Sequence, residues 1–129
     1  AILEAEELLD SGDAAGLNDM LPGSERWRLF GEFGKNAAYL DIETDGLERT
    51  SLVTVVTIHT EKDTVTLTQG KDLDAGTLSD ALDGVSMLVT FNGSCFDIPV
   101  LRESFPTLDL EYPHLDLRFG ARKAGYRGV

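Results

Sequence analysis

Apolar and polar positions divide the chain into two parts with different periods. Residues 2–10 place apolar side chains at helical spacing between glutamates and end at Ser11-Gly12, which is typical of a short amphipathic helix. Apolar and aromatic anchors continue from Leu17 to Phe33 without a strand period. We interpret them as packing contacts of a segment that wraps a core. The alternative is a surface on which a partner docks.

From Ala37 the pattern changes to that of β-strands. Three predicted strands at 37–42, 52–58 and 64–68 are separated by short polar turns, which favours an antiparallel meander. The third strand alternates strictly between apolar and polar residues, as expected of a half-exposed strand. Residues 73–82 then predict a helix, and 87–91 predict a strand that is buried on both faces.

The last third of the chain continues the alternation of helices and strands. A turn at 92–94 precedes a predicted helix at 96–105, where Pro99 falls in the first turn and its missing N–H does no harm. Residues 114–117 predict a short strand, and 118–123 predict the start of another helix. The order β-β-β-α-β-α-β-α predicts an α/β fold with a mixed sheet.

Charge narrows the choice of partners. The chain carries 23 acidic and 11 basic side chains and a net charge of −12, which argues against salt-driven binding of nucleic acid over the whole surface. Four bases nevertheless fall in the last twelve residues, where there is no acid: Arg118, Arg122, Lys123 and Arg127. These four side chains either bind phosphates or keep an exposed helix face hydrated.

Targeting signals and cysteines bear on the compartment. No apolar run approaches the ~18 residues of a membrane span, and no secretory leader precedes the acidic start. Cys95 is the single cysteine, so an internal disulfide is excluded. We therefore expect a cytoplasmic protein without a membrane partner.

Two carboxylates stand one residue apart in an apolar strand. Alternate strand residues share a face, so Asp41 and Glu43 point one way while Leu40 and Ile42 point the other. Like charges side by side destabilise a strand unless a cation lies between them. Mg²⁺ suits this position because it binds one or two carboxylates and keeps waters that a phosphate can displace. A solvated strand edge is the alternative.

A third carboxylate follows another predicted core strand. Asp97 comes shortly after the strand at 87–91, while Thr44 and Gly46 follow the acidic pair where a backbone can approach a ligand. Ligands of α/β sheets bind beyond the carboxyl ends of the strands. We therefore expect Asp41, Glu43 and Asp97 to converge.

These residues resemble a known family. Leu40-Asp41-Ile42-Glu43-Thr44-x-Gly46-Leu47 and, further along, Phe91-Asn92-Gly93-x-x-Phe96-Asp97-Ile98-Pro99-x-Leu101 resemble the first two motifs of the DEDD 3′-5′ exonucleases of the ribonuclease H-like fold. His114-Leu115-Asp116-Leu117 resembles the YprB-like branch of that superfamily, whose members are predicted nucleases. The proofreading exonuclease domain of family B DNA polymerases is a nearby alternative.

The resemblance implies a metal-dependent nuclease that acts on single-stranded ends of DNA or RNA with two Mg²⁺ or Mn²⁺ ions. Asp41 would bridge the two ions, and Glu43 and Asp97 would complete their ligation. Two such ions about 4 Å apart activate a water, hold the scissile phosphate and stabilise the leaving 3′ oxygen.

The resemblance also implies contacts with the substrate from Thr44, Gly46, Leu47, Asn92, Phe96, His114 and Asp116. Three of these residues have a second interpretation. Phe96 would pack beneath the site, His114 would make a structural hydrogen bond rather than act as a general base, and Asp116 would support the site rather than touch the substrate.

The sequence departs from the family pattern at its end. The family uses a fourth carboxylate, an Asp in a late helix preceded by Tyr or His, and no acid follows Asp116. We expect this motif beyond Val129, which gives a helical wrapping segment at 1–36 and an incomplete exonuclease domain at 37–129. The alternative function is a catalytically inactive ribonuclease H-like module that binds nucleic acid or protein.

Overall fold

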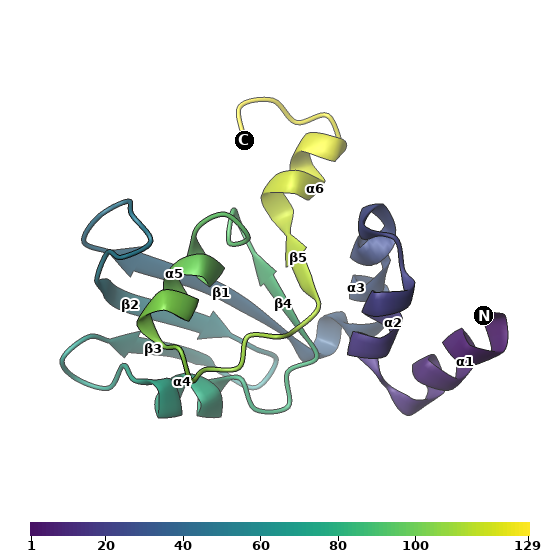
Figure 1. The fold of residues 1–129 in the computed structure, drawn as a ribbon, viewed down its shortest axis with the longest axis horizontal. Helices are drawn as coiled ribbons and strands as arrows, with labels where there is room; N and C mark the ends of the chain where they lie inside the picture. Colours follow the sequence, from purple (N-terminus) through teal and green to yellow (C-terminus); the bar gives the residue numbers. More distant parts are fainter.

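Five strands form one mixed sheet in the order β3-β2-β1-β4-β5 in the computed structural model, which describes residues 1–129 (Figure 1). The strands are β1 (Ala37–Thr44), β2 (Val53–His59), β3 (Thr64–Thr68), β4 (Met87–Thr90) and β5 (His114–Asp116). β2 is antiparallel to β1 and β3, whereas β4 is parallel to β1 and β5. The predicted meander and the predicted α/β fold with a mixed sheet are confirmed.

Helices flank this sheet and precede it. The α-helices are α1 (Ile2–Ser11), α2 (Ala14–Met20), α3 (Leu29–Phe33), α4 (Ala75–Ala81), α5 (Asp97–Ser104) and α6 (Leu117–Lys123). Two 3₁₀ turns, η1 (Gly23–Arg28) and η2 (Gly34–Asn36), complete the N-terminal part. None of the helices is long and apolar enough to cross a membrane.

Side-chain alternation along β1 assigns its two faces. Leu40 and Ile42 are buried, while Asp41 and Glu43 are exposed on the opposite face. β4 is buried along its whole length, which fits a central strand of a parallel pair. Phe91 was included in the predicted strand but lies beyond the end of β4 and is exposed, because the chain turns away there.

Two apolar clusters hold the layers together. On one face, residues of α4 and α5 such as Leu78 and Leu101 pack against Leu40 and Ile42. Figure 1 shows α5 in front of the sheet and α4 along its lower edge. On the other face, α2 and α3 contribute a smaller cluster: Ala14, Leu29 and Phe33 packed with Ala37, Met87 and Val89. The predicted packing role of the 17–33 segment is thus confirmed for its buried anchors.

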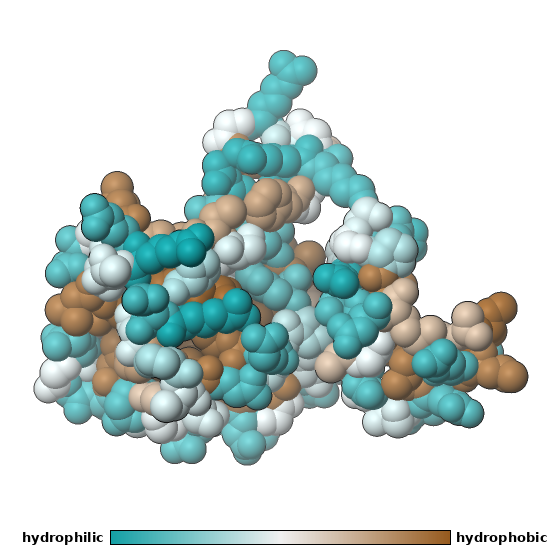
Figure 2. Space-filling model, in the orientation of Figure 1, coloured by the Kyte–Doolittle hydropathy of each residue, from teal (hydrophilic) through white to brown (hydrophobic).

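The first helix stands apart from both clusters. α1 contributes no buried residue, and Figure 2 shows its apolar tip projecting from the body of the molecule. Its last turn ends at Gly12, whose φ of 72° is the left-handed conformation that glycine adopts readily. The functional site therefore has to be sought on the sheet and not on α1.

Candidate active site at the carboxyl ends of the central strands

The centre of the sheet contains a gap between neighbouring strands. The ladder between β1 and β4 ends at the pair Tyr39–Val89, but β1 continues to Thr44 while pairing only with β2. The chain leaves β4 at Thr90, turns, and enters α5 at Asp97. Because β2 and β4 lie on opposite sides of β1, this gap is the point where the strand order reverses, and α/β sheets bind ligands at such points.

Asp97 is buried in this gap. The residue is 5% exposed, and its Oδ2 atom has no hydrogen-bond partner. Burial, followed by the charge of Asp41, raises the pKa of Asp97 to about 6; the charge of Asp116 adds to the rise, and backbone N–H groups of Asp97 and Ile42 oppose it. A buried polar atom without a partner is costly, so a native structure that retains one calls for an explanation.

Asp41 and Glu43 lie on the open face of β1, and Asp41 is the one of the two that lies near Asp97. Asp41 lines a shallow cavity of about 320 Å³ together with Tyr39, His59 and Phe91. Its charge acts on Asp97, so the two carboxylates are electrostatic neighbours. Glu43 shares the exposed face of Asp41, and the pairing of β1 with β2 shifts register immediately after it.

The donor atoms of this site suit a hard divalent cation. Carboxylate oxygens are the ligands that Mg²⁺ and Mn²⁺ prefer, and the unpartnered Oδ2 of Asp97 is available to one. The side chains are not preassembled, however: no three His, Cys, Asp or Glu residues are grouped so as to hold a metal ion. The structure thus makes Asp41 and Asp97 neighbours but does not gather all three predicted carboxylates into one ligand cluster.

Asp116 has the opposite environment. Its Oδ1 accepts the N–H of Asn92 at 2.8 Å and the N–H of Arg118 at 3.1 Å, and its Oδ2 accepts the N–H of Ser94 at 3.1 Å as well as the Ser94 hydroxyl. Burial raises the pKa of Asp116, but hydrogen bonds from Ser94, Asn92 and Arg118 outweigh it and lower the pKa overall. Asp116 therefore anchors the turn that leads to Asp97. Both of its carboxylate oxygens are already engaged in hydrogen bonds.

The anchored turn depends on two unusual backbone positions. Asn92 adopts a φ of 64°, and its Oδ1 accepts a hydrogen bond from Arg118 Nη1 at 2.7 Å. At Gly93 an added Cβ would lie 2.5 Å from the Cβ of Thr90, which is too close for any side chain. The close approach lets the Gly93 N–H donate to the Thr90 hydroxyl at 3.1 Å. The turn therefore requires glycine at 93.

His114 joins β5 to β4 at the base of this turn. Its Nε2 lies 2.7 Å from the hydroxyl of Thr90, which is itself buried. Burial lowers the pKa of His114, with the charge of Asp116 opposing the shift, so the imidazole is neutral near pH 7. The Thr90 hydroxyl accepts the Gly93 N–H and can donate to this neutral ring. Phe96 is partly buried and packs against the larger core cluster.

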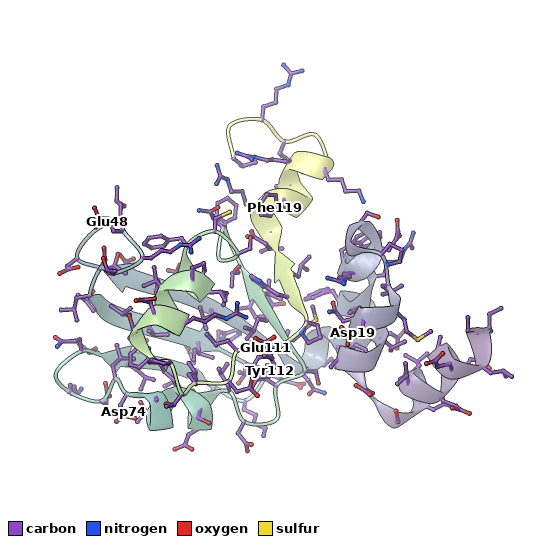
Figure 3. All side chains as sticks on the ribbon, in the orientation of Figure 1. Asp19, Glu48, Asp74, Glu111, Tyr112 and Phe119 are labelled. Carbon is purple, nitrogen blue, oxygen red and sulfur yellow. The ribbon has the colours of Figure 1, made fainter.

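The loop after β1 lies at the same end of the sheet. Thr44 Oγ1 donates to the carbonyl of Gly46 at 2.5 Å, and an added Cβ at Gly46 would lie 2.8 Å from Ser51 Oγ. Leu47 is 93% exposed at the loop surface. Glu48, labelled in Figure 3, marks the position of this loop. The side chain of Leu47 is therefore free to contact a substrate, whereas Thr44 and Gly46 shape the loop.

Sequence reasoning did not single out Thr90 and Ser94, which both hold the turn. Thr90 carried a signal, because it is the polar residue of a short, otherwise apolar strand whose side chains are all buried. Ser94 carried no comparable signal. Its role depends on Asp116, which is distant in sequence and becomes its neighbour only because β5 lies beside β4.

Comparison with known proteins places this arrangement in a family. The model of the RNase H superfamily matches residues 38–129, and the chain therefore belongs to the RNase H superfamily. The fold is also similar to the crystal structure of the Aedes aegypti Nibbler EXO domain, with a TM-score of 0.55 and 13% sequence identity over 81% of this chain. This chain spans 54% of that domain. No curated protein matches the sequence.

Proposed function

We propose that this chain is the metal-binding part of a nuclease, a 3′-5′ exonuclease that hydrolyses phosphodiester bonds at single-stranded ends of DNA or RNA. The observation that carries the proposal is Asp97, a buried carboxylate with an unpartnered oxygen beside Asp41, where the strand order reverses. The superfamily and the likeness to an exonuclease domain support it. The nuclease domain would be 37–129, with 1–36 as an accessory segment.

Three carboxylates would hold Mg²⁺ or Mn²⁺ in this proposal. Asp97 contributes its free Oδ2 from the buried side of the gap, and Asp41 contributes from the open face of β1. Glu43 shares the face of Asp41 and would join by a side-chain rotation. When bound, two divalent ions supply the charge that activates a water and stabilises the leaving oxygen.

The remaining predicted residues would position the substrate or the site. Leu47 is exposed at the loop after β1, and Asn92 lies in the turn after β4. Asp116 and His114 would act indirectly, since the first anchors that turn and the second braces its base. Their substitution would therefore displace Asp97 rather than remove a reacting group.

A second candidate function is an inactive RNase H-like binding module. The absence of a preassembled group of three ligands favours it. In such a module the carboxylates would remain without a metal, and the fold would serve only to present a surface.

Titration with Mn²⁺ separates the two functions. The nuclease proposal expects saturable Mn²⁺ binding that weakens in Asp41→Asn, Glu43→Gln and Asp97→Asn by about 10-fold or more, at least the loss typical of an outer-shell partner. Glu61→Gln is the matched control, because Glu61 is an exposed acid in the turn after β2, at the other end of the sheet. Absence of saturable binding, or equal binding by all variants, would favour the inactive module.

Cleavage by the natural protein that contains this chain tests the reaction itself. Single-stranded DNA and RNA carrying a label at either end reveal both the preferred sugar and the direction of digestion. Asp41→Asn should abolish Mg²⁺- or Mn²⁺-dependent cleavage while leaving the far-ultraviolet circular dichroism spectrum unchanged. Undiminished cleavage by a folded Asp41→Asn protein would refute the assignment.

A further inference from the structure

A second cavity of about 950 Å³ opens beside the carboxylate site. It lies between η1 on one side and β5 and α6 on the other, so it combines the N-terminal segment with the end of the chain. It is lined by Arg26, Trp27, Arg28, Phe119 and Lys123, and also by the carboxylates of Glu25 and Asp116. Phe119, labelled in Figure 3, comes from the first turn of α6. We refer to this cavity as the basic groove.

Basic side chains are concentrated in the two segments of the chain that border the basic groove. Residues 23–30 and 117–129 together hold six of the 11 basic side chains but one of the 23 acidic ones. Of those six bases, only Arg28 forms an ion pair with a carboxylate, that of Glu25. Lys123 instead donates to the carbonyl of Ser24 at 2.9 Å, and Arg26 donates to the carbonyl of Asn18 at 3.0 Å. Three of the six, Arg26, Arg28 and Lys123, line the cavity itself, together with the carboxylates of Glu25 and Asp116, so the lining carries one net positive charge in a protein of net charge −12.

Aromatic side chains stand among these bases. Trp27 and Phe119 are each 49% exposed, although both are large enough to dominate a core. The guanidinium of Arg28 lies 4.8 Å from the centroid of the Trp27 ring, a cation–π arrangement that orients the ring. Exposed aromatic rings beside basic side chains are typical of surfaces on which nucleotide bases stack while phosphates meet cations.

Other ligands fit the groove less well. An acidic peptide would satisfy the bases but would leave Trp27 and Phe119 exposed. An amphipathic helix would cover the rings but would bring apolar surface against Arg26 and Lys123. A single nucleic acid strand presents both a charged backbone and apolar base faces, whereas the bases of a duplex are stacked on one another and hidden.

We propose that the basic groove binds single-stranded nucleic acid, with bases stacked on Trp27 and Phe119 and phosphates facing Arg26, Arg28 and Lys123. Asp116, which anchors the turn before Asp97, also lines the groove, so a strand in the groove would lead toward the carboxylate site. That direction rests on the proposed function. Binding in the groove does not, because its N-terminal wall lies outside the superfamily match at 38–129.

The chain offers a direct probe of this binding, because Trp27 is its single tryptophan. Unlabelled oligothymidylate or oligouridylate is titrated in low salt with EDTA, so that no metal-dependent cleavage occurs, and the fluorescence of Trp27 is recorded. Stacking of a base on the ring predicts saturable quenching that is lost as salt is raised. Binding of a fluorescein-labelled oligonucleotide, seen as anisotropy without any change in Trp27 fluorescence, would overturn the proposal.

Variants then test the two walls separately. Trp27→Ala and Phe119→Ala should each weaken oligonucleotide binding about 10-fold, the loss typical of one stacked base. Trp27→Phe should restore most of the affinity, and Lys123→Gln should weaken binding and reduce its salt dependence. Lys62→Gln and Leu9→Ala are controls at an exposed base and an exposed apolar residue outside the groove. Equal affinity of all these folded variants would refute the groove as the binding site.

Failure of this proposal and failure of the nuclease assignment give different results. If Asp41→Asn abolishes cleavage while Trp27→Ala binds and cleaves like the wild type, the nuclease stands and the basic groove is refuted. If oligonucleotides quench Trp27 in the wild type and the anisotropy of a labelled oligonucleotide shows weaker binding by Trp27→Ala and Phe119→Ala, all without any cleavage, the groove stands and the nuclease assignment fails. If polyglutamate quenches Trp27 and displaces the oligonucleotide at equal charge concentration, the groove binds acidic protein segments and the proposal is overturned.

Discussion

Two junctions of the sheet invite comparison, because each joins a parallel strand to a helix and each contains an aspartate. Asp97 begins α5 after β4, and Asp116 ends β5 and caps α6. Asp116 accepts four hydrogen bonds and its pKa is lowered despite burial, whereas Oδ2 of Asp97 accepts none and the pKa of Asp97 rises to about 6. Both carboxylate oxygens of the aspartate accept hydrogen bonds at the second junction, whereas one oxygen has no partner at the first.

The difference arises from where the turn after β4 directs its N–H groups. The N–H groups of Asn92 and Ser94 both donate to Asp116. Neither of them is therefore available to Asp97. A folded protein that satisfied both carboxylates would be more stable. The unsatisfied one lies beside a second carboxylate at the reversal of strand order, which is where perturbed pKa values mark functional groups.

The largest effect on stability is predicted for removal of the Asp116 carboxylate, whose two oxygens are both hydrogen-bonded. Asp116→Ala removes the acceptor of four hydrogen bonds and leaves partly buried N–H groups of the turn unpaired, so the free energy of unfolding should fall by about 3 kcal/mol or more. Urea denaturation followed by circular dichroism measures it. Asp116→Asn keeps one oxygen and should lose less. A change below about 0.5 kcal/mol, the range of ordinary surface substitutions, would show that Asp116 does not hold the turn.

Much of this framework could be predicted from local pattern. The alternation that separates Leu40 and Ile42 from Asp41 and Glu43 was enough to assign the faces of β1, because side chains of a strand alternate strictly. The position of Asp97 at a strand-to-helix junction followed in the same way. Periodicity thus gave the elements, and the rule for α/β sheets gave the end of the sheet at which the acids lie.

Side-chain partners could not be predicted in this way, since they depend on which strands become neighbours. The bond between Thr90 and His114 joins β4 to β5, and that between Ser94 and Asp116 joins the turn after β4 to β5. Nothing local in the sequence specifies that β4 and β5 become neighbours. The sequence therefore left Asp116 between a substrate contact and a supporting residue. Likewise, the basic groove joins Trp27 to α6 only through tertiary packing.

Replacement of Asp97 is expected to have an intermediate effect on stability, and the effect should be stabilising. The folded protein keeps the Asp97 proton up to about pH 6, whereas the unfolded chain releases it near pH 4. The unfolded state then binds fewer protons, so stability falls as pH rises between these values and is constant above them. Asp97→Asn should therefore be more stable than the wild type by roughly 3 kcal/mol at pH 7, since each pKa unit is worth about 1.4 kcal/mol, and nearly equal to it near pH 4.

Urea denaturation across this pH range measures the Asp97 effect, and Mn²⁺ adds a second test. A cation that binds only the folded wild type should raise its free energy of unfolding at pH 7 without stabilising Asp97→Asn. Glu61→Gln serves as a control, because its removal of one surface charge should give no step in this window. A difference between wild type and Asp97→Asn that does not vary with pH would show that burial does not raise the Asp97 pKa.

The smallest predicted effect concerns the residue that connects the two junctions. Asn92→Ala should cost about 1 kcal/mol, because alanine tolerates the left-handed φ of 64° poorly and loses the bond from Arg118. Asn92→Gly removes that backbone strain and should cost less. In double-mutant cycles, Asn92→Ala should couple to Asp116→Asn, since the Asn92 N–H donates to that carboxylate, and should be additive with Asp97→Asn. Coupling to Asp97 instead would mean that the turn serves the unsatisfied carboxylate, and the contrast between the two junctions would fail.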